Sequence, residues 1–267
     1  MMSPDVAAAE AALLDRAEID ATQMRQTTGE YPDLTIDDAY VIQAAWQEIK
    51  LARGEVLVGH KIGLTSRAMQ ASMNITTPDS GFLTDRMVFE PDTRLVAADF
   101  CDPKLEIELA FVLNTDLAGD DLSADDILDA TEYVVPAIEL IAARSFRRDP
   151  DSGRTRTVVD TIADNAANAG IIMGGTKVAP RDIDLRWVSA LGSRNGVIEE
   201  TGVAAGVLGH PAMGIAWLAR RYHEQGLTLE KGQIILAGSF TRPIDIRPGD
   251  DFHFDYGPLG AFSLGFN

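Results

Sequence analysis

The sequence predicts an α+β fold built on a mixed or antiparallel β-sheet with few helices, and two observations support this prediction. Short apolar or alternating runs, separated by Gly, Pro, Asp and Asn, recur from residue 56 onward, as expected of strands joined by turns. The pair Asn195-Gly196 stands between two of these runs and is the favoured two-residue hairpin turn, which indicates antiparallel pairing. The predicted strands are residues 56–62, 94–98, 105–113, 133–142, 170–173, 187–191, 197–200, 234–237 and 252–256.

Helical patterns precede and interrupt these strands. Apolar residues at spacings of three and four predict helical structure from residue 4 to about residue 49, with Thr35 and Asp38 as a helix-starting cap. Later helices are expected over residues 123–131 and 212–225. The change of pattern near residue 50 predicts two parts, a helical N-terminal segment (1–52) and a mixed-sheet domain that carries the candidate site (53–267).

The composition is that of an acidic protein, with 41 Asp and Glu against 23 Lys and Arg and a formal net charge of −18 over 267 residues. Such a surface repels phosphate backbones and anionic lipid headgroups, so nucleic acid and membranes are poor partners. Cys101 is the sole cysteine, which excludes an intrachain disulfide and a multi-cysteine zinc site and suits a reducing compartment. Asp5 and Glu10 stand where a signal peptide would be basic, and no run approaches the ~18 apolar residues of a membrane span. We therefore expect a cytoplasmic protein.

Three glutamates stand out because of the runs that contain them. Side chains on a strand alternate between its faces, so Glu106 and Glu108 share one face, roughly 7 Å apart at ~3.4 Å of rise per residue. The apolar run that follows them indicates burial on both faces. Glu139 is the only charge within residues 133–143. Buried carboxylates repel one another and lose hydration unless a cation or protons lie between them.

Three carboxylates without a nearby histidine or cysteine favour a hard divalent ion, Mg²⁺ or Mn²⁺, with coordination positions left open for water or a bidentate substrate. Two other interpretations remain open at this point. Glu106 and Glu108 also fit a solvated strand face, and Glu139 also fits a buried acid paired with an arginine such as Arg144.

Lys61 ends an apolar strand and precedes a glycine turn, within the sequence GHKIG at residues 59–63. This position predicts a partly buried amine with a depressed pKa, suited to acid–base chemistry. The alternative is a surface lysine that extends its charged end into water. The sequence PDSG at residues 78–81 predicts a turn with an Asx-type cap.

Basic residues are concentrated in one segment, where five of the 23 lie within thirteen positions: Arg144, Arg147, Arg148, Arg154 and Arg156. Because arginine binds carboxylates through two parallel hydrogen bonds, the segment is a candidate for holding a second carboxylate of an anionic substrate. Charge balance against neighbouring acids is the alternative. The sequence contains no strand-linked Gly-x-Gly-x-x-Gly, no Walker loop and no Gly-x-Ser-x-Gly elbow, so nucleotide-binding and serine-hydrolase functions have no support.

Taken together, these motifs resemble the hydratase and decarboxylase branch of the fumarylacetoacetate hydrolase superfamily, over nearly the whole chain from about residue 30. The matching motifs are GHKIG at 59–63, PDSG at 78–81, PKLEIELAF at 103–111, PAIE at 136–139, DTIADN at 160–165 and GSFTRP at 238–243. The resemblance implies a rolled mixed β-sheet with a small helical N-terminal segment, assembled into homo-oligomers.

The resemblance also implies roles for individual residues. It makes Glu106, Glu108 and Glu139 the ligands of Mg²⁺ or Mn²⁺, and Lys61 and Asp79 the catalytic acid and base in either order. It implies contacts with the substrate for four further residues: Gly81, Leu83, Arg144 and Thr161.

The implied reaction is a metal-dependent addition of water to an unsaturated 2-oxo dicarboxylic acid in aromatic catabolism, within the homoprotocatechuate meta-cleavage pathway of 4-hydroxyphenylacetate degradation. The histidine–glutamate lid of the carbon–carbon hydrolases of the superfamily is not apparent, which argues against hydrolysis. A 2-oxo-enedioate decarboxylase and a non-catalytic partner subunit of a hydratase–decarboxylase complex are the alternatives.

Overall fold

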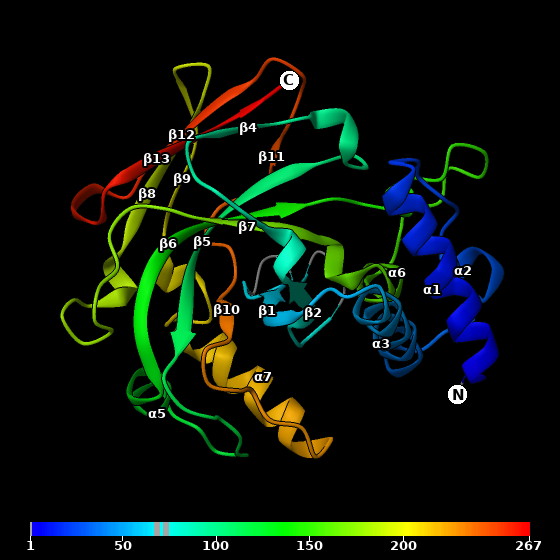
Figure 1. The fold of residues 1–267 in the computed structure, drawn as a ribbon, viewed down its shortest axis with the longest axis horizontal. Helices are drawn as coiled ribbons and strands as arrows, with labels where there is room; N and C mark the ends of the chain where they lie inside the picture. Colours follow the sequence, from blue (N-terminus) through cyan, green and yellow to red (C-terminus); the bar gives the residue numbers. More distant parts are fainter. Residues whose placement is uncertain (1, 67–69, 72–74) are drawn as a thin grey trace.

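Two β-sheets form the centre of the molecule, and a group of N-terminal helices packs against the larger one (Figure 1). The computed structural model describes residues 2–66, 70, 71 and 75–267. Mixed sheets with few helices confirm the predicted α+β class. No helix in these described ranges is long and apolar enough to cross a membrane.

The larger sheet has eight strands in the described part of the chain. Most neighbours are antiparallel, but β1 pairs with β10 and β3 pairs with β7 in parallel, so the sheet is mixed. The short strand β11 (Ile244–Asp245) pairs with one end of β5. The order of the other strands is β2 (Asp79–Thr84), β1 (Leu57–Gly63), β10 (Ile234–Leu236), β5 (Lys104–Leu113), β6 (Thr131–Ile141), β7 (Asn168–Met173) and β3 (Val88–Phe89).

The smaller sheet contains the predicted hairpin. Asn195 and Gly196 have φ angles of 54° and 79° and join β8 to β9, as the two-residue turn requires. Strand β13 was not among the predicted strands, although it alternates apolar and small residues. The order of this sheet is β4 (Thr93–Leu95), β13 (Ala261–Phe266), β12 (Asp251–Asp255), β8 (Ser189–Arg194) and β9 (Val197–Val203).

Six α-helices lie in the described residues: α1 (Pro4–Ile19), α2 (Thr27–Glu30), α3 (Ile36–Ala52), α5 (Ala124–Asp129), α6 (Val158–Ala163) and α7 (Ala212–Glu224). Thr35 and Asp38 form the predicted capping box at the start of α3. Helix α6 was not predicted, although Thr157 and Asp160 form the same kind of cap before it. Short 3₁₀ turns cover Asp85–Met87, Ala97–Asp99, Asn165–Ala167, Leu185–Trp187, Ala204–Gly206 and Gly257–Leu259.

Alternate residues of β5 face two different cores. Leu105, Ile107 and Leu109 pack between the two sheets and α7. Ala110 belongs to a second core, which the N-terminal helices share with the other face of the larger sheet. In that second core Trp46 of α3 packs edge-on against Phe82 of β2, with ring centroids 6.0 Å apart. Glu106 and Glu108 therefore point to the same face as Ala110, the face covered by the N-terminal helices, which we call the helix-covered face. The division into residues 1–52 and 53–267 stays a prediction, since helices and strands share this core.

One predicted local structure was wrong. Asp79, Ser80 and Gly81, interpreted as a turn after Pro78, begin the strand β2, whose six residues are all buried. The sequence suggested a turn because Pro, Asp, Ser and Gly are the residue types that form turns most often. Here antiparallel pairing with β1 satisfies their backbone groups, and Gly63 is the direct partner of Asp79.

Candidate active site

Three carboxylates meet on the helix-covered face of the larger sheet. Glu106 on β5 is the paired neighbour of Glu139 on β6, and Glu108 lies two residues further along β5 on the same face. One oxygen from each lies within 4.8 Å of the others. Glu108 and Glu139 are fully buried and Glu106 is half-buried, so the solvated strand face is excluded as an interpretation.

The carboxylate oxygens of this cluster are poorly satisfied by the protein itself. The backbone N–H of Gly238 donates to Glu108 Oε2 at 2.8 Å. Glu108 Oε1 and Glu139 Oε2 are buried with no hydrogen-bond partner in the described part of the chain. Burial and the charges of neighbouring carboxylates raise the pKa of Glu108 well above its ordinary value. Burial raises the pKa of Glu139 to about 7, although Lys61 opposes the shift.

Orphaned oxygens of this kind fit a divalent ion. Buried acceptors without donors are costly, and a cation would supply both the missing partners and the missing positive charge. An all-oxygen donor set is the one that Mg²⁺ and Mn²⁺ prefer. Glu106, Glu108 and Glu139 would therefore hold such an ion.

Lys61 lies beside the cluster rather than at the surface. Its Nζ is 3.2 Å from Glu139 Oε1, and 3% of the residue is exposed, so the surface-lysine interpretation is excluded. Glu139 thus pairs with this lysine and not with Arg144. Burial acts to lower the pKa of Lys61, but the charges of Glu139 and Asp79 raise it above its ordinary value. The prediction of a depressed pKa for Lys61 is therefore wrong, because the negative charges of the neighbouring carboxylates together outweigh the effect of burial.

Asp79 is the second polar residue next to Lys61. Its carboxylate is buried, and its Oδ1 has no hydrogen-bond partner among the described residues. Burial raises its pKa, while the charges of Lys61 and Arg156 oppose the shift. Gly63 lies between the two side chains. A Cβ at that position would be 2.2 Å from Asp79 Oδ1 and 3.0 Å from Lys61 Nζ, so only glycine leaves room for both.

A cavity opens over these groups. Its lining includes Lys61, Asp79 and Glu106, together with Arg147, Arg156 and Thr161. A second cavity is lined by Ser239, Thr241 and Arg242. The two cavities share Gly63, Leu64, Glu106 and Pro243. The half-buried carboxylate of Glu106 is therefore reached from both.

Of the four residues expected to contact substrate, one lines this cavity and three do not. Thr161 lines the cavity, where a substrate contact stays a prediction, and it accepts a hydrogen bond from Arg156 Nε at 3.0 Å. Leu83 is fully buried in the core of the N-terminal helices. Gly81 packs against the backbone of Asn165, whose oxygen would lie 2.4 Å from a Cβ at that position. Arg144 is buried against Asp164 and does not line this cavity. A substrate contact for these last three stays a prediction without support from the geometry.

The sequence did not predict two structural features next to the site, a hydrogen-bonded tyrosine and a left-handed backbone segment. The Tyr256 hydroxyl lies between β5 and β6, 3.0 Å from the Glu108 carbonyl oxygen and 2.7 Å from that of Ala137. Asn165, Ala166 and Ala167 have φ angles of 52°, 49° and 63°, a left-handed run of non-glycine residues of which Ala166 and Ala167 line the cavity. Nothing in the sequence pattern indicates the tyrosine. The Asp-Asn pair at 164–165 is the only local signal for the left-handed run, because asparagine tolerates that conformation.

The family described as fumarylacetoacetate (FAA) hydrolase C-terminal matches residues 33–264. The chain belongs to the fumarylacetoacetate hydrolase family. Within this family it is 54% identical over 253 residues to the 2-oxo-hept-4-ene-1,7-dioate hydratase of Escherichia coli, covering 95% of each protein. It is also 35% identical over 256 residues to the 4-oxalocrotonate decarboxylase of Pseudomonas putida, covering 95% of this chain and 94% of that protein.

Two solved structures are similar to the chain in fold. The 4-oxalocrotonate decarboxylase from Pseudomonas putida G7, complexed with magnesium and adipate, superposes with a TM-score of 0.94 at 31% identity, covering 100% of this chain and 99% of that chain. Fumarylpyruvate hydrolase from Pseudomonas aeruginosa has a TM-score of 0.60 at 12% identity, over 79% and 89% of the two chains, and shows the fold alone. The fumarylacetoacetate hydrolase-like fold expected from the motifs is thus confirmed.

Proposed function

We propose that this family member is a hydro-lyase that adds water to 2-oxohept-4-ene-1,7-dioate, giving 4-hydroxy-2-oxoheptanedioate. The observation that carries this is the 54% identity, over nearly the full length of both proteins, to a hydratase with that name. Other relatives are named as hydratases of shorter substrates, at 34–36% identity. A place in the homoprotocatechuate meta-cleavage pathway is part of the same proposal.

The site supports a division of labour between a metal and two side chains. A divalent ion, when bound by the three glutamates, would act as a Lewis acid on the C1 carboxylate and C2 oxygen of a 2-oxo acid. It would also offset the negative charge that raises the pKa of Lys61. We propose Mg²⁺, or Mn²⁺ in its place.

Lys61 and Asp79 complete the proposed chemistry. The C4=C5 double bond of the substrate is not conjugated to the C2 carbonyl, so the reaction passes through the 2-hydroxydienoate, which gains a proton at C5 and loses its enol proton to give the conjugated 2-oxo-3-ene. Water then adds across C3=C4, with its oxygen at C4 and a proton at C3. Asp79 Oδ1 is free to accept a proton from the attacking water, since it has no other partner in the described residues. Lys61 Nζ carries three N–H donors, and among the described residues its ion pair is with Glu139. We assign Asp79 as the base and Lys61 as the acid that delivers the proton to C3.

The decarboxylase activity of other relatives is the second candidate, favoured by the TM-score of 0.94 to the 4-oxalocrotonate decarboxylase. Loss of CO₂ also develops negative charge on the C2 oxygen, so the same cluster would serve it. The deciding assay incubates purified protein and Mg²⁺ with enzymatically generated 2-hydroxyhepta-2,4-dienedioate. A 4-hydroxy product without CO₂ is expected. Release of CO₂ without that product would identify a decarboxylase, and no product would favour a non-catalytic partner subunit.

Location and assembly follow as lesser parts of the proposal. A lone buried cysteine suits the reducing cytoplasm. Exposed apolar residues lie on and before the edge strand β9, including Trp187, Val197 and Ile198. Exposed apolar side chains beside a sheet edge favour a homo-oligomer, and light scattering on purified protein measures its size.

A further inference from the structure

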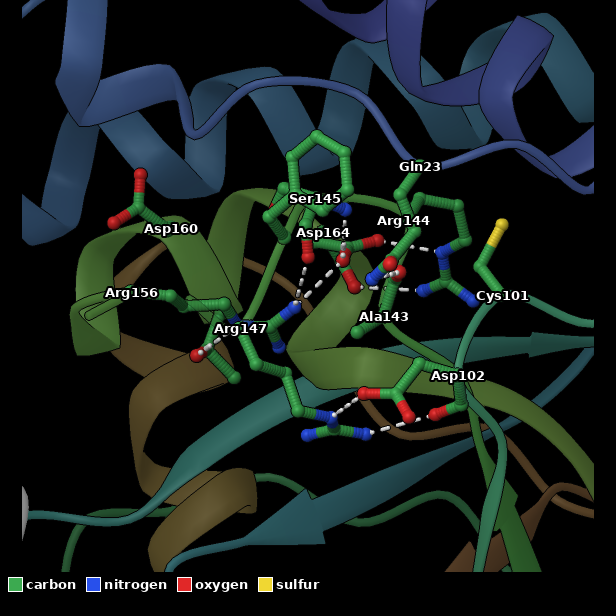
Figure 2. Close-up of polar contacts among 12 residues, drawn as sticks. Gln23, Cys101, Asp102, Ala143, Arg144, Ser145, Arg147, Arg156, Asp160 and Asp164 are labelled. Carbon is green, nitrogen blue, oxygen red and sulfur yellow. Dashed lines mark hydrogen bonds and ion pairs between the residues drawn. The ribbon is translucent and has the colours of Figure 1, made fainter. Parts of the chain in front are cut away.

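One buried carboxylate serves two buried guanidinium groups next to the cavity. Arg144 Nε donates to Asp164 Oδ1 at 2.5 Å, and Arg156 Nη1 donates to Asp164 Oδ2 at 3.0 Å (Figure 2). All three residues are buried. Arg144 has a further, longer ion pair with Glu18 Oε1 at 3.9 Å, whereas Asp164 is the one ion-pair partner of Arg156 in the described residues. Arg156 therefore shares its counter-ion with Arg144 in a poorly hydrated place.

The two arginines differ in how completely they are satisfied. Arg144 also donates to the carbonyl oxygens of Asn168 and Asp164, and its guanidinium lies over the ring of Trp46 at 4.9 Å. It is closed off from the cavity. Arg156 donates through Nε to Thr161 and through Nη1 to Ser145 and Asp164, but its Nη2 has no partner in the described ranges.

Arg156 also has the right surroundings for an anionic ligand. Together with Thr161 it lines the cavity that contains Lys61, Asp79 and Glu106. Arg147, the other arginine of this lining, is half-exposed and already paired with Asp102 through Nε at 2.6 Å (Figure 2). Arg147 Nη1 also lacks a partner in the described residues, but its guanidinium has the carboxylate of Asp102 to itself, whereas Arg156 shares Asp164 with Arg144. The charge of Arg156 is therefore the less compensated of the two, which favours it as the partner of an entering carboxylate.

We propose that Arg156 binds the distal carboxylate of the substrate and thereby selects dicarboxylic over monocarboxylic 2-oxo acids. This assignment rests on the proposed function, since it takes the 2-oxo acid head to lie at the glutamate cluster. Asp164 and Thr161 act as positioning residues, because their hydrogen bonds to Nη1 and Nε fix the guanidinium and leave Nη2 available. Charged hydrogen bonds of this kind contribute ~1.5–3 kcal/mol, which corresponds to roughly a 10- to 150-fold effect on affinity.

The test is calorimetric binding in Mg²⁺ of two matched ligands, 2-oxoheptanedioate and 2-oxoheptanoate, which differ only in the distal carboxylate. The unmodified protein should bind the dicarboxylate at least ~10-fold more tightly. Arg156→Gln should remove that preference and leave the affinity for the monocarboxylate within about 2-fold. Arg156→Lys should restore part of the preference, because it keeps the charge but not the fork. Arg148→Gln, from the same segment but outside the cavity lining, should change neither affinity.

Other results would overturn the assignment. Equal losses for both ligands in folded Arg156→Gln and Arg156→Lys would give Arg156 a purely structural role. Retained preference in these variants, with its loss in Arg147→Gln, would move the role to Arg147, and an unmodified protein without any preference would refute the subsite. The hydration assay is separate, so an enzyme that prefers the dicarboxylate but forms no 4-hydroxy product would refute the proposed reaction and leave the Arg156 assignment intact.

Discussion

Glu106 and Glu139 stand directly opposite each other on the adjacent antiparallel strands β5 and β6. This pairing puts two like charges at the closest cross-strand position, which is unfavourable unless a cation lies between them. A slip of one residue in the register would turn Glu139 to the other face of the sheet. The register of this one strand pair therefore determines whether the three carboxylates can meet as a candidate metal site.

The first prediction concerns the metal centre. Glu139→Gln should lower Mg²⁺ affinity at least ~10-fold, since even the loss of an outer-shell partner costs that much. In the unmodified protein, saturating Mg²⁺ should raise the unfolding temperature, and EDTA should abolish hydration. Calorimetric titration and thermal unfolding measure both effects. Glu132→Gln, an exposed position on the same strand, is the matched control and should leave Mg²⁺ binding unchanged.

The second prediction separates the proposed base from the metal ligands. Asp79→Asn should lower kcat by roughly 10²- to 10⁴-fold, because the amide cannot accept a proton from water. Its Mg²⁺ affinity should stay within about 2-fold of the unmodified value. The unfolding temperature should not fall, since the change removes a buried charge. Steady-state kinetics beside metal titration decides the matter, and a kcat near the original would rule out Asp79 as the base.

The third prediction tests the close approach at Gly63. Gly63→Ala should abolish hydration, because the added methyl would occupy the space between Asp79 and Lys61. Moving these side chains apart should also lower the unfolding temperature. Gly29→Ala is a suitable control, since its nearest neighbour, 3.2 Å away, is the guanidinium end of Arg154. Full activity in Gly63→Ala would show that the Lys61–Asp79 arrangement is not needed.

The fourth prediction concerns acid stability. Burial lowers the pKa of His60 to about 4, and its Nδ1 lies 3.0 Å from the Tyr222 hydroxyl. The unfolded chain, with an ordinary pKa near 6.5, takes up this proton first. The contribution of neutral His60 is therefore complete above about pH 6.5 and is lost as the pH falls towards 4. Its size is on the order of 3–4 kcal/mol, from ~1.4 kcal/mol per pKa unit.

Denaturant unfolding between pH 7 and pH 4.5 measures this contribution. His60→Gln should show a shallower loss of stability than the unmodified protein, whereas His223→Gln, on the exposed part of α7, should follow the original curve. Identical slopes for all three proteins would contradict the prediction.

Local pattern predicted the shared face of Glu106 and Glu108 and the burial of Glu139, whereas their role as metal ligands stays a prediction. The alternation around Glu106 and Glu108 follows from the two-residue period of a strand, and Glu139 was conspicuous as a lone charge in an apolar run. Their meeting depends on the β5–β6 register, which no local pattern contains. The prediction of a turn at Asp79 was wrong, because its sequence neighbours are turn formers. Such residues also occur in strands when a neighbouring strand satisfies their backbone groups, as β1 does here.

The arginine segment shows that residue spacing can predict an anion site but not the individual residue that forms it. Five arginines in thirteen residues predicted an anion site but could not tell which guanidinium faces the cavity. Arg144 and Arg156 are distinguished only by tertiary contacts, because Asp164 and Asn168 satisfy one of them more fully than the other.

Strand β10 has a consequence for the way the chain matures during synthesis. It lies between β1 and β5, so Lys61 and the glutamates are joined through residues 234–236, near the far end of the chain. A nascent chain that has passed Glu139 already carries every proposed metal ligand but lacks the strand that brings β1 beside them. The Lys61–Glu139 pair therefore forms late, after nearly the whole polypeptide has left the ribosome, and a truncated chain ending before residue 234 cannot build this site.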